Sequence, residues 1–176
     1  MLILRATQKI LRTLPCAIED SASSTNALGD WYVNRVMIDR KPLLLLVSST
    51  SLLPMVIGAK DVKSLPGRFP GLIEARLRRI GVPAAIAAAE TQESVVIGIG
   101  RTLDRSVVGQ MVDFAKAMRV YVPEGAWDER CLPAVEERLA ETPCRASKPQ
   151  SEVVFPRAKA VELLHNRWLC PRTERL

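Results

Sequence analysis

The chain has 176 residues, a length typical of one globular domain with or without a small C-terminal appendage. Hydrophobic residues make up 48% of it and charged residues 25%, a composition that excludes wholesale disorder. The formal net charge is +6, and the surplus lies in residues 1–120, which hold 16 Lys and Arg against 10 Asp and Glu, whereas residues 121–176 hold 9 of each. A positive body favours an anionic partner, such as nucleic acid or an acidic protein surface, although such a charge can also serve solubility alone.

The first predicted elements are a short strand and a short helix. Residues 1–6 (MLILRA) are typical of a strand, and Thr7 can cap a helix that Pro15 ends. Residues 17–29 are rich in Ser, Asn, Asp and Gly, so we expect a loop there.

The clearest pattern is a β-hairpin. Residues 31–38 and 42–49 are two apolar runs on either side of a polar break at 39–41. The first run alternates between two faces, and the second is apolar on both faces, which favours a central strand. Residues 51–59 predict a third strand, and Pro54 within it indicates an edge or a bulge.

Helical periodicity follows over residues 64–80, which Gly81 and Pro83 end. Arg76 falls within the apolar stripe of this helix and therefore needs a partner or a route to solvent. Residues 83–90 predict a second, short helix, and residues 94–100 predict a strand.

The strongest helix pattern covers residues 105–118, with Asp104 as its N-cap. Beyond it, residues 127–141 predict a short polar helix and residues 142–151 a linker. A final helix is expected from Pro156, a good first-turn residue, to Trp168.

Together these elements predict an α+β fold. We expect a mixed or mainly antiparallel sheet, built on a central hairpin at about 31–49, with helices packed on one face. Residues 1–120 would form the α+β body, and residues 121–176 a mainly helical C-terminal extension.

The sequence supports neither a membrane protein nor a protein stabilised by disulfides. No apolar run approaches the ~20 residues of a membrane-spanning helix. No signal peptide is visible, because Arg5 and Lys9 interrupt the N-terminal apolar segment. The four cysteines include no CxxC pair, so we expect free, reduced thiols in a cytoplasmic protein.

No catalytic or cofactor motif is recognisable. His165 is the single histidine and no two cysteines lie close together, so we predict no metal site. Gly98 and Gly100 precede a helix but lack the third glycine and the βαβ context of a dinucleotide loop. The carboxylates are dispersed along the chain, although the fold could still gather some of them. We therefore predict no cofactor and no catalytic residue, and favour a non-enzymatic protein.

Basic side chains are the remaining candidates for a site. If their faces coincide they would form a nucleic-acid or anion-binding patch; otherwise they form a solvated face. Few aromatic residues interleave with them, which argues against single-strand recognition by base stacking. The candidates are Arg35, Arg40, Lys41, Arg68, Arg78, Arg79, Arg101 and Arg105.

The GDWYVN segment at 29–34, the IDR turn at 38–40 and the RSVVG helix start at 105–109 form a pattern, preceded by an LRAT strand. This pattern resembles an uncharacterised family of small bacterial proteins, classed only as a domain of unknown function, with similar segments in proteins from plasmids and insertion elements. The resemblance covers roughly residues 1–120 and implies no established activity.

The resemblance implies that the positions carrying the pattern are Trp31, Asn34, Asp39, Arg40, Arg105 and Ser106. Beside the two arginines, we predict a polar cluster of Trp31, Asn34, Asp39 and Ser106. Asn34 could face the helix start at Arg105 and Ser106, where backbone N–H groups would suit an anion. The alternative is structural, with Asn34 bonded to neighbouring backbone and Arg105 paired with an acid.

We expect a non-enzymatic binding or accessory protein of a plasmid or mobile-element system, which contacts nucleic acid or a nucleic-acid-associated protein through its basic body. One alternative is a protein inhibitor or antitoxin-type partner. Another is a metal-independent, ribonuclease-like toxin that uses groups such as Arg105 and Tyr32. A homo-oligomer is compatible with each.

Overall fold

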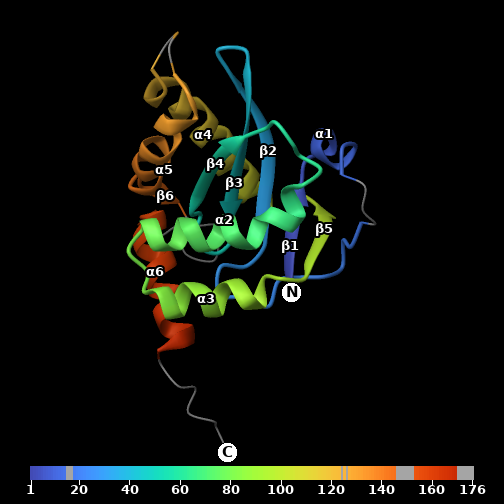
Figure 1. The fold of residues 1–176 in the computed structure, drawn as a ribbon, viewed down its shortest axis with the longest axis vertical. Coiled ribbons are helices and arrows are strands. Elements are labelled where there is room, and N and C mark those ends of the chain that lie inside the picture. Colours follow the sequence, from blue (N-terminus) through green and yellow to red (C-terminus); the bar gives the residue numbers. More distant parts are fainter. Residues whose placement is uncertain (15–17, 124, 126, 146–152, 170–176) are drawn as a thin grey trace, which may run out of the picture.

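A five-stranded mixed sheet organises the protein, in a computed structural model that describes residues 1–14, 18–123, 125, 127–145 and 153–169 (Figure 1). The strands are β1 (Leu2–Ala6), β2 (Trp31–Ile38), β3 (Lys41–Ser48), β4 (Pro54–Gly58) and β5 (Ile97–Arg101). Their order across the sheet is β4-β3-β2-β1-β5. β1 runs parallel to β2 and β5, whereas β2, β3 and β4 pair in an antiparallel manner. The predicted α+β class and the central hairpin are confirmed.

Helices cover both faces of this sheet, rather than the single face that we expected from the sequence. The helical elements are α1 (Gln8–Leu11), α2 (Leu65–Arg79), α3 (Ala84–Glu93), α4 (Arg105–Tyr121), the 3-10 turn η1 (Glu129–Cys131), α5 (Leu132–Ala140) and α6 (Pro156–Trp168). One core lies between the sheet and α2 and α3, and the other lies between the sheet and α4 and α5. The reason is the alternation within β3, where Leu44 enters the first core and Leu45 the second.

The strand β2 shows the same alternation and supplies the largest buried side chain. Trp31 is fully buried in the α2-side core and meets the Phe69 ring edge-on, with 5.5 Å between ring centroids. Tyr32 points to the α4 side. Arg35 and Met37 continue the Trp31 face, and both are exposed. The α2 face of the sheet is therefore open toward the hairpin end.

The hairpin turn is tighter than the three-residue break predicted from the sequence. β3 begins at Lys41, so only Asp39 and Arg40 form the turn. Their φ angles are 47° and 62°, as a two-residue type I′ turn requires. Neither residue is the glycine that this turn prefers, and a left-handed non-glycine residue costs on the order of 1 kcal/mol.

Several predicted elements are confirmed with shifted ends. Pro54 does begin an edge strand. The Asp104 carboxylate caps α4 by accepting a 2.8 Å hydrogen bond from the Ser106 N–H. Thr7 does occupy the N-cap position of α1, but its hydroxyl donates to Asn34 and makes no cap hydrogen bond.

The segment beyond α4 packs tightly on the body. The helix expected to be polar, α5, buries Leu132, Val135 and Leu139 in the α4-side core. The strand β6 (Cys144–Arg145) lies within the linker predicted at 142–151 and pairs with β7 (Val153–Val154), which comes after it. Residues 146–152 lie outside the described residues. The boundary predicted at residue 120 falls in the last turn of α4.

Candidate nucleic-acid interface

A pocket rich in cations lies between α1, β2 and the connection from β4 to α2. Its volume is about 250 Å³, and we call it the basic pocket. Four cationic side chains and one carboxylate line it: Lys9, Arg35, Lys60, Lys63 and Asp61. The carboxyl ends of the parallel strands β1 and β2 lead to this end of the sheet, where open α/β sheets commonly bind ligands.

The cations of the basic pocket are weakly neutralised. Lys60 Nζ lies 3.0 Å from a Glu129 carboxylate oxygen, but 86% of the Lys60 side chain is exposed, and such surface pairs contribute little. Among the described residues, Lys9, Arg35 and Lys63 have no ion-pair partner. These positive charges are therefore available to an anion from outside.

Asp61 is the carboxylate of the basic pocket, and its own helix start holds it. Its Oδ1 accepts a 3.3 Å hydrogen bond from the Ser64 N–H, just before α2. Hydrogen bonds from Ser64 lower the pKa of Asp61, and the nearby Arg68 lowers it further. Asp61 thus stays ionised and offsets one of the four cations.

A groove of about 290 Å³ adjoins the basic pocket along the edge of β4, and Lys60 lines both. Arg68 and Arg79, which were predicted candidates, line this groove with Glu129 and Glu136. Arg79 forms an ion pair with Glu136 and is neutralised by it. Arg68 has no ion-pair partner within the described residues and extends the positive surface from the basic pocket.

The other predicted cations divide between two places. Arg40 lies at the hairpin tip, and Lys41 beside it donates a 2.7 Å hydrogen bond to the Trp127 carbonyl while its ammonium lies 4.7 Å from that ring centroid. Arg101 ends β5 and pairs with Asp20 at 3.5 Å.

Arg78 and Arg105 are exposed and lie apart from the basic pocket. Arg78 is in the last turn of α2, and Arg105 begins α4 on the opposite face of the sheet. The structure therefore gathers only part of the predicted set: Arg35 lines the basic pocket, and Arg68 and Arg79 line the adjoining groove.

The predicted polar cluster does not converge into one site among the described residues. Trp31 is buried in the α2-side core. Asn34 Oδ1 accepts a 2.8 Å hydrogen bond from the Arg35 N–H and one from Thr7. Asp39 accepts from the Gly125 N–H at 3.2 Å, and Ser106 donates to Asp104. Each of these residues supports its own turn, strand or helix start.

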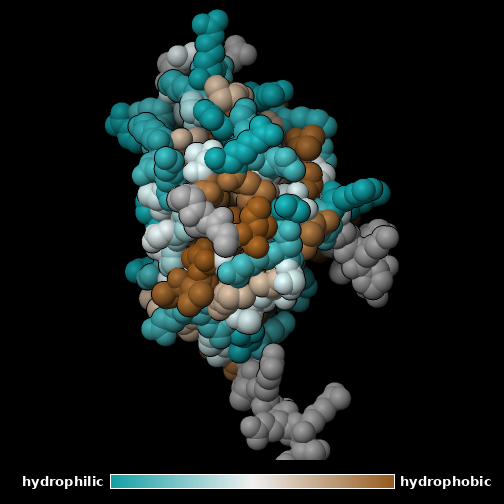
Figure 2. Space-filling view, turned by 90° about the vertical axis from the view of Figure 1, so that its right-hand side faces the viewer, coloured by the Kyte–Doolittle hydropathy of each residue, from teal (hydrophilic) through white to brown (hydrophobic). Residues whose placement is uncertain are grey.

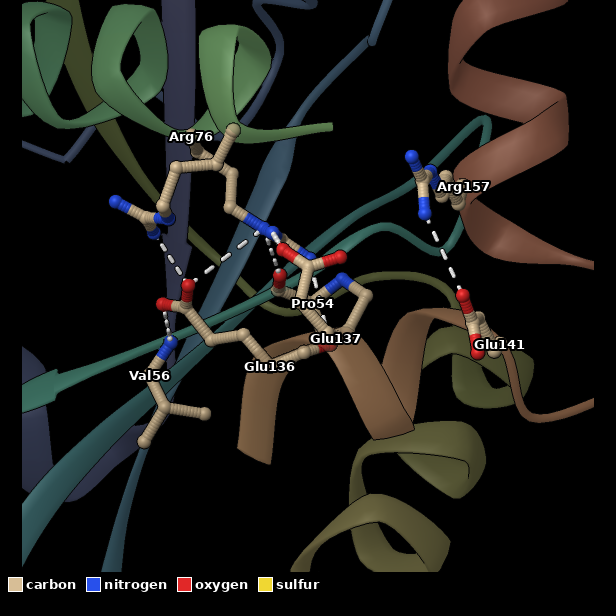
Figure 3. Close-up of polar contacts among 8 residues, drawn as sticks. Pro54, Val56, Arg76, Glu136, Glu137, Glu141 and Arg157 are labelled. Carbon is tan, nitrogen blue, oxygen red and sulfur yellow. Dashed lines mark hydrogen bonds and ion pairs between the residues drawn. The ribbon is translucent and has the colours of Figure 1, made fainter. Parts of the chain in front are cut away.

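Sequence reasoning missed an ion-pair network that joins α2, α5 and the edge of β4 (Figure 3). The fully buried Arg76 donates through Nε to the Pro54 carbonyl at 3.0 Å and pairs with Glu137 and Glu136. Glu136 also accepts a 2.7 Å hydrogen bond from the Val56 N–H. These side chains satisfy the outward backbone groups of β4, which closes part of an otherwise open sheet edge.

A second buried ion pair anchors the loop before β2. Arg5 Nε donates to Asp30 at 2.7 Å, and its other nitrogens donate to the carbonyls of Asp20 and Ala22. Asp30 in turn accepts from the N–H and hydroxyl of Ser24. A lone arginine within the apolar strand 1–6 was the sequence signal for this network.

The face beside β5 differs from the basic pocket. Hydrophobic residues gather in the middle of this face, between hydrophilic regions (Figure 2). Val95, Val96 and Leu103, which adjoin β5 in the chain, are exposed apolar residues, and so is Ile18, which bridges to Ile99 of β5. The basic surface is therefore not continuous over this side.

Within the described ranges, no group of three or more His, Cys, Asp or Glu side chains is arranged to hold a metal ion. Burial raises the pKa of the Cys144 thiol to about 11, so this thiol is protonated at neutral pH and is a poor nucleophile.

Fold and surface together define an α+β module with a mixed sheet and a cationic end. The family model described as "Domain of unknown function (DUF6933)" matches residues 3–159, and the chain belongs to this family. The match continues past residue 120 into α5 and α6. No curated protein matches the chain. In the part of the chain that the structure describes, no helix is long and apolar enough to cross a membrane.

Proposed function

We propose that the protein is a non-enzymatic nucleic-acid-binding protein that contacts backbone phosphates through the basic pocket. The observation that carries this proposal is the set of four cations around one carboxylate in a single pocket. Phosphate contacts by Lys and Arg release counterions and supply sequence-independent affinity. Arg68 and Lys60 extend the same field along the β4 groove.

Backbone phosphates are better candidate ligands of the basic pocket than stacked bases. The residues that line the basic pocket include no aromatic side chain. Single-strand binders without sequence preference commonly stack bases on aromatic rings, whereas backbone contacts need only donors and positive charge. We further propose a cytoplasmic accessory role in a plasmid or mobile-element system, which rests on the sequence resemblance.

The burial of Tyr32 weakens the alternative that the protein is a ribonuclease-like toxin. Tyr32 is only 3% exposed, and its hydroxyl accepts a 2.9 Å hydrogen bond from the Asp104 N–H. A phenol that is buried and bonded to backbone is a poor candidate for proton transfer to an RNA substrate.

Removing three lysines of the basic pocket is expected to weaken binding strongly. In the variant Lys9→Gln, Lys60→Gln, Lys63→Gln, three phosphate contacts are lost, so affinity for a labelled duplex should fall by more than about tenfold at 100 mM salt. The slope of log affinity against log salt should become shallower by about one per lysine. Fluorescence anisotropy over about 50–200 mM salt measures both quantities.

A matched control removes the same charge elsewhere. Lys116→Gln, Arg157→Gln, Lys159→Gln alters cations that pair with carboxylates away from the basic pocket. We expect its affinity to stay within about threefold of the wild type, as for charges that make no phosphate contact. Equal losses in both variants would mean that net charge alone drives binding. A wild-type protein that binds no nucleic acid at the lowest salt would end the proposal.

A further inference from the structure

The tip of the β2–β3 hairpin holds one cation that the fold does not use. Asp39 accepts a hydrogen bond from the Gly125 N–H, and Lys41 is bonded to the Trp127 carbonyl. Arg40, between them, is exposed and makes no hydrogen bond or ion pair with the described residues. No polar contact within the described fold therefore holds its guanidinium.

Arg40 also occupies a strained position. Its φ of 62° lies in the left-handed region, where glycine is at ease and a Cβ is not. Strained non-glycine residues often accompany binding or switching sites. An exposed side chain on a strained backbone, with no hydrogen bond or ion pair to the described residues, is available for a partner.

The β2–β3 hairpin has a shape that suits insertion into a groove of a binding partner. The β2–β3 ribbon projects past the helices at the upper end of the molecule (Figure 1). Along one face of the ribbon, Arg35 and Met37 are exposed, with 45% of Met37 accessible. Behind the tip, Arg119 lines a cavity with Met37 and Asp39. The ribbon thus offers cations and one apolar side chain together.

We infer that this hairpin enters the major groove of duplex DNA, with Arg40 at the base edges, while the basic pocket holds the adjacent phosphates. The inference rests on the proposed function. The major groove of B-DNA admits a two-stranded β-ribbon, arginine bonds guanine through two donors, and an apolar side chain suits the thymine methyl group. Arg35 belongs to both the ribbon and the basic pocket, so one docking pose engages both.

Duplex DNA is favoured over duplex RNA by groove shape. The major groove of A-form RNA is deep and narrow, and side chains do not reach its base edges. Phosphate contacts by the basic pocket would serve either duplex. Arg40 should therefore matter for DNA and not for RNA.

The variant Arg40→Gly separates binding from folding. Glycine relieves the left-handed strain, so the melting temperature should rise by about 2–4 °C. Affinity for duplex DNA should fall by about tenfold or more, whereas affinity for an RNA duplex of the same sequence stays unchanged. Arg40→Lys keeps the charge without the planar fork and should lose the preference for guanine-containing sites.

Each outcome decides the matter. Unchanged affinity of Arg40→Gly for duplex DNA overturns the inference, and so does an equal loss on both duplexes, which would make Arg40 one more phosphate contact. The proposed function stands or falls separately, because the triple lysine variant should lose affinity for both duplexes. If the hairpin does not contact the bases of DNA, the proposal that the basic pocket binds phosphates is therefore unaffected.

Discussion

Replacing Arg76 by Leu is expected to lower the free energy of unfolding by about 3–5 kcal/mol, because the buried carboxylate of Glu136 loses its buried cation and keeps only the half-exposed Arg79. Arg76 is fully buried, and its Nε lies 3.7 Å from a Glu136 oxygen that is itself buried. Desolvation already raises the pKa of Glu136 against the opposing influence of Arg76. Urea denaturation followed by circular dichroism measures the loss.

The neighbouring arginine is a matched control. Arg79 pairs with the same carboxylate of Glu136, but 39% of its side chain is exposed to solvent. We expect Arg79→Leu to cost no more than about 1 kcal/mol, because water screens the half-exposed Arg79 and Arg76 still pairs with Glu136. Similar losses for the two variants would show that burial does not set the strength of this network.

The double variant Arg76→Leu, Glu136→Leu tests what the network does for the sheet edge. An isolated buried ion pair can often be replaced by apolar residues at little cost. Here the Pro54 carbonyl and the Val56 N–H would also lose their partners. Each orphaned buried group costs roughly 1–3 kcal/mol, so we expect the double variant to regain only part of the stability that Arg76→Leu loses. Wild-type stability in the double variant would mean that water satisfies the backbone groups at the edge of β4.

Local patterns in the sequence predicted local structure well. The alternation of β2 and the double apolar character of β3 follow from residues two positions apart, so the hairpin was predictable. The tight turn was not, because Asp39 and Arg40 both adopt a conformation that glycine prefers. Composition gave no sign that such strain would be accepted.

Contacts between distant segments were beyond such reasoning. Arg76 was expected to need a partner, but its acceptor Glu136 lies 60 residues away on α5. Lys9 and Lys60 join Arg35 only because α1 and the β4–α2 connection meet at one end of the sheet. The sequence therefore predicted basic candidates, while the fold decided which of them share a pocket.

Glu90 fastens three elements, and its replacement by Gln should lower the free energy of unfolding by about 1–3 kcal/mol. Its Oε1 accepts a 3.0 Å hydrogen bond from the Leu28 N–H, and its Oε2 accepts from the Ala27 N–H and the Trp168 indole. All three partners are donors. A glutamine must turn its own NH2 group toward at least one of them, which leaves donors facing each other.

The loss of stability caused by Glu90→Gln should also depend on pH. Burial raises the pKa of Glu90, against hydrogen bonds from Leu28 and Trp168 that lower it. The folded state therefore binds a proton more tightly than the unfolded state, whose value is near 4.5. The stability that this group contributes is fully present below that value and is lost as pH rises through the raised folded pKa.

Glutamine cannot titrate, so the stability gap between wild type and Glu90→Gln should narrow as pH rises from about 4.5 toward 8. Urea denaturation at several pH values measures this gap. Glu93→Gln is the control, because Glu93 pairs with Arg167 at 2.5 Å in a half-buried position one turn away on α3. A gap that widens with pH would mean that the folded state stabilises the ionised carboxylate, with the three donors outweighing burial.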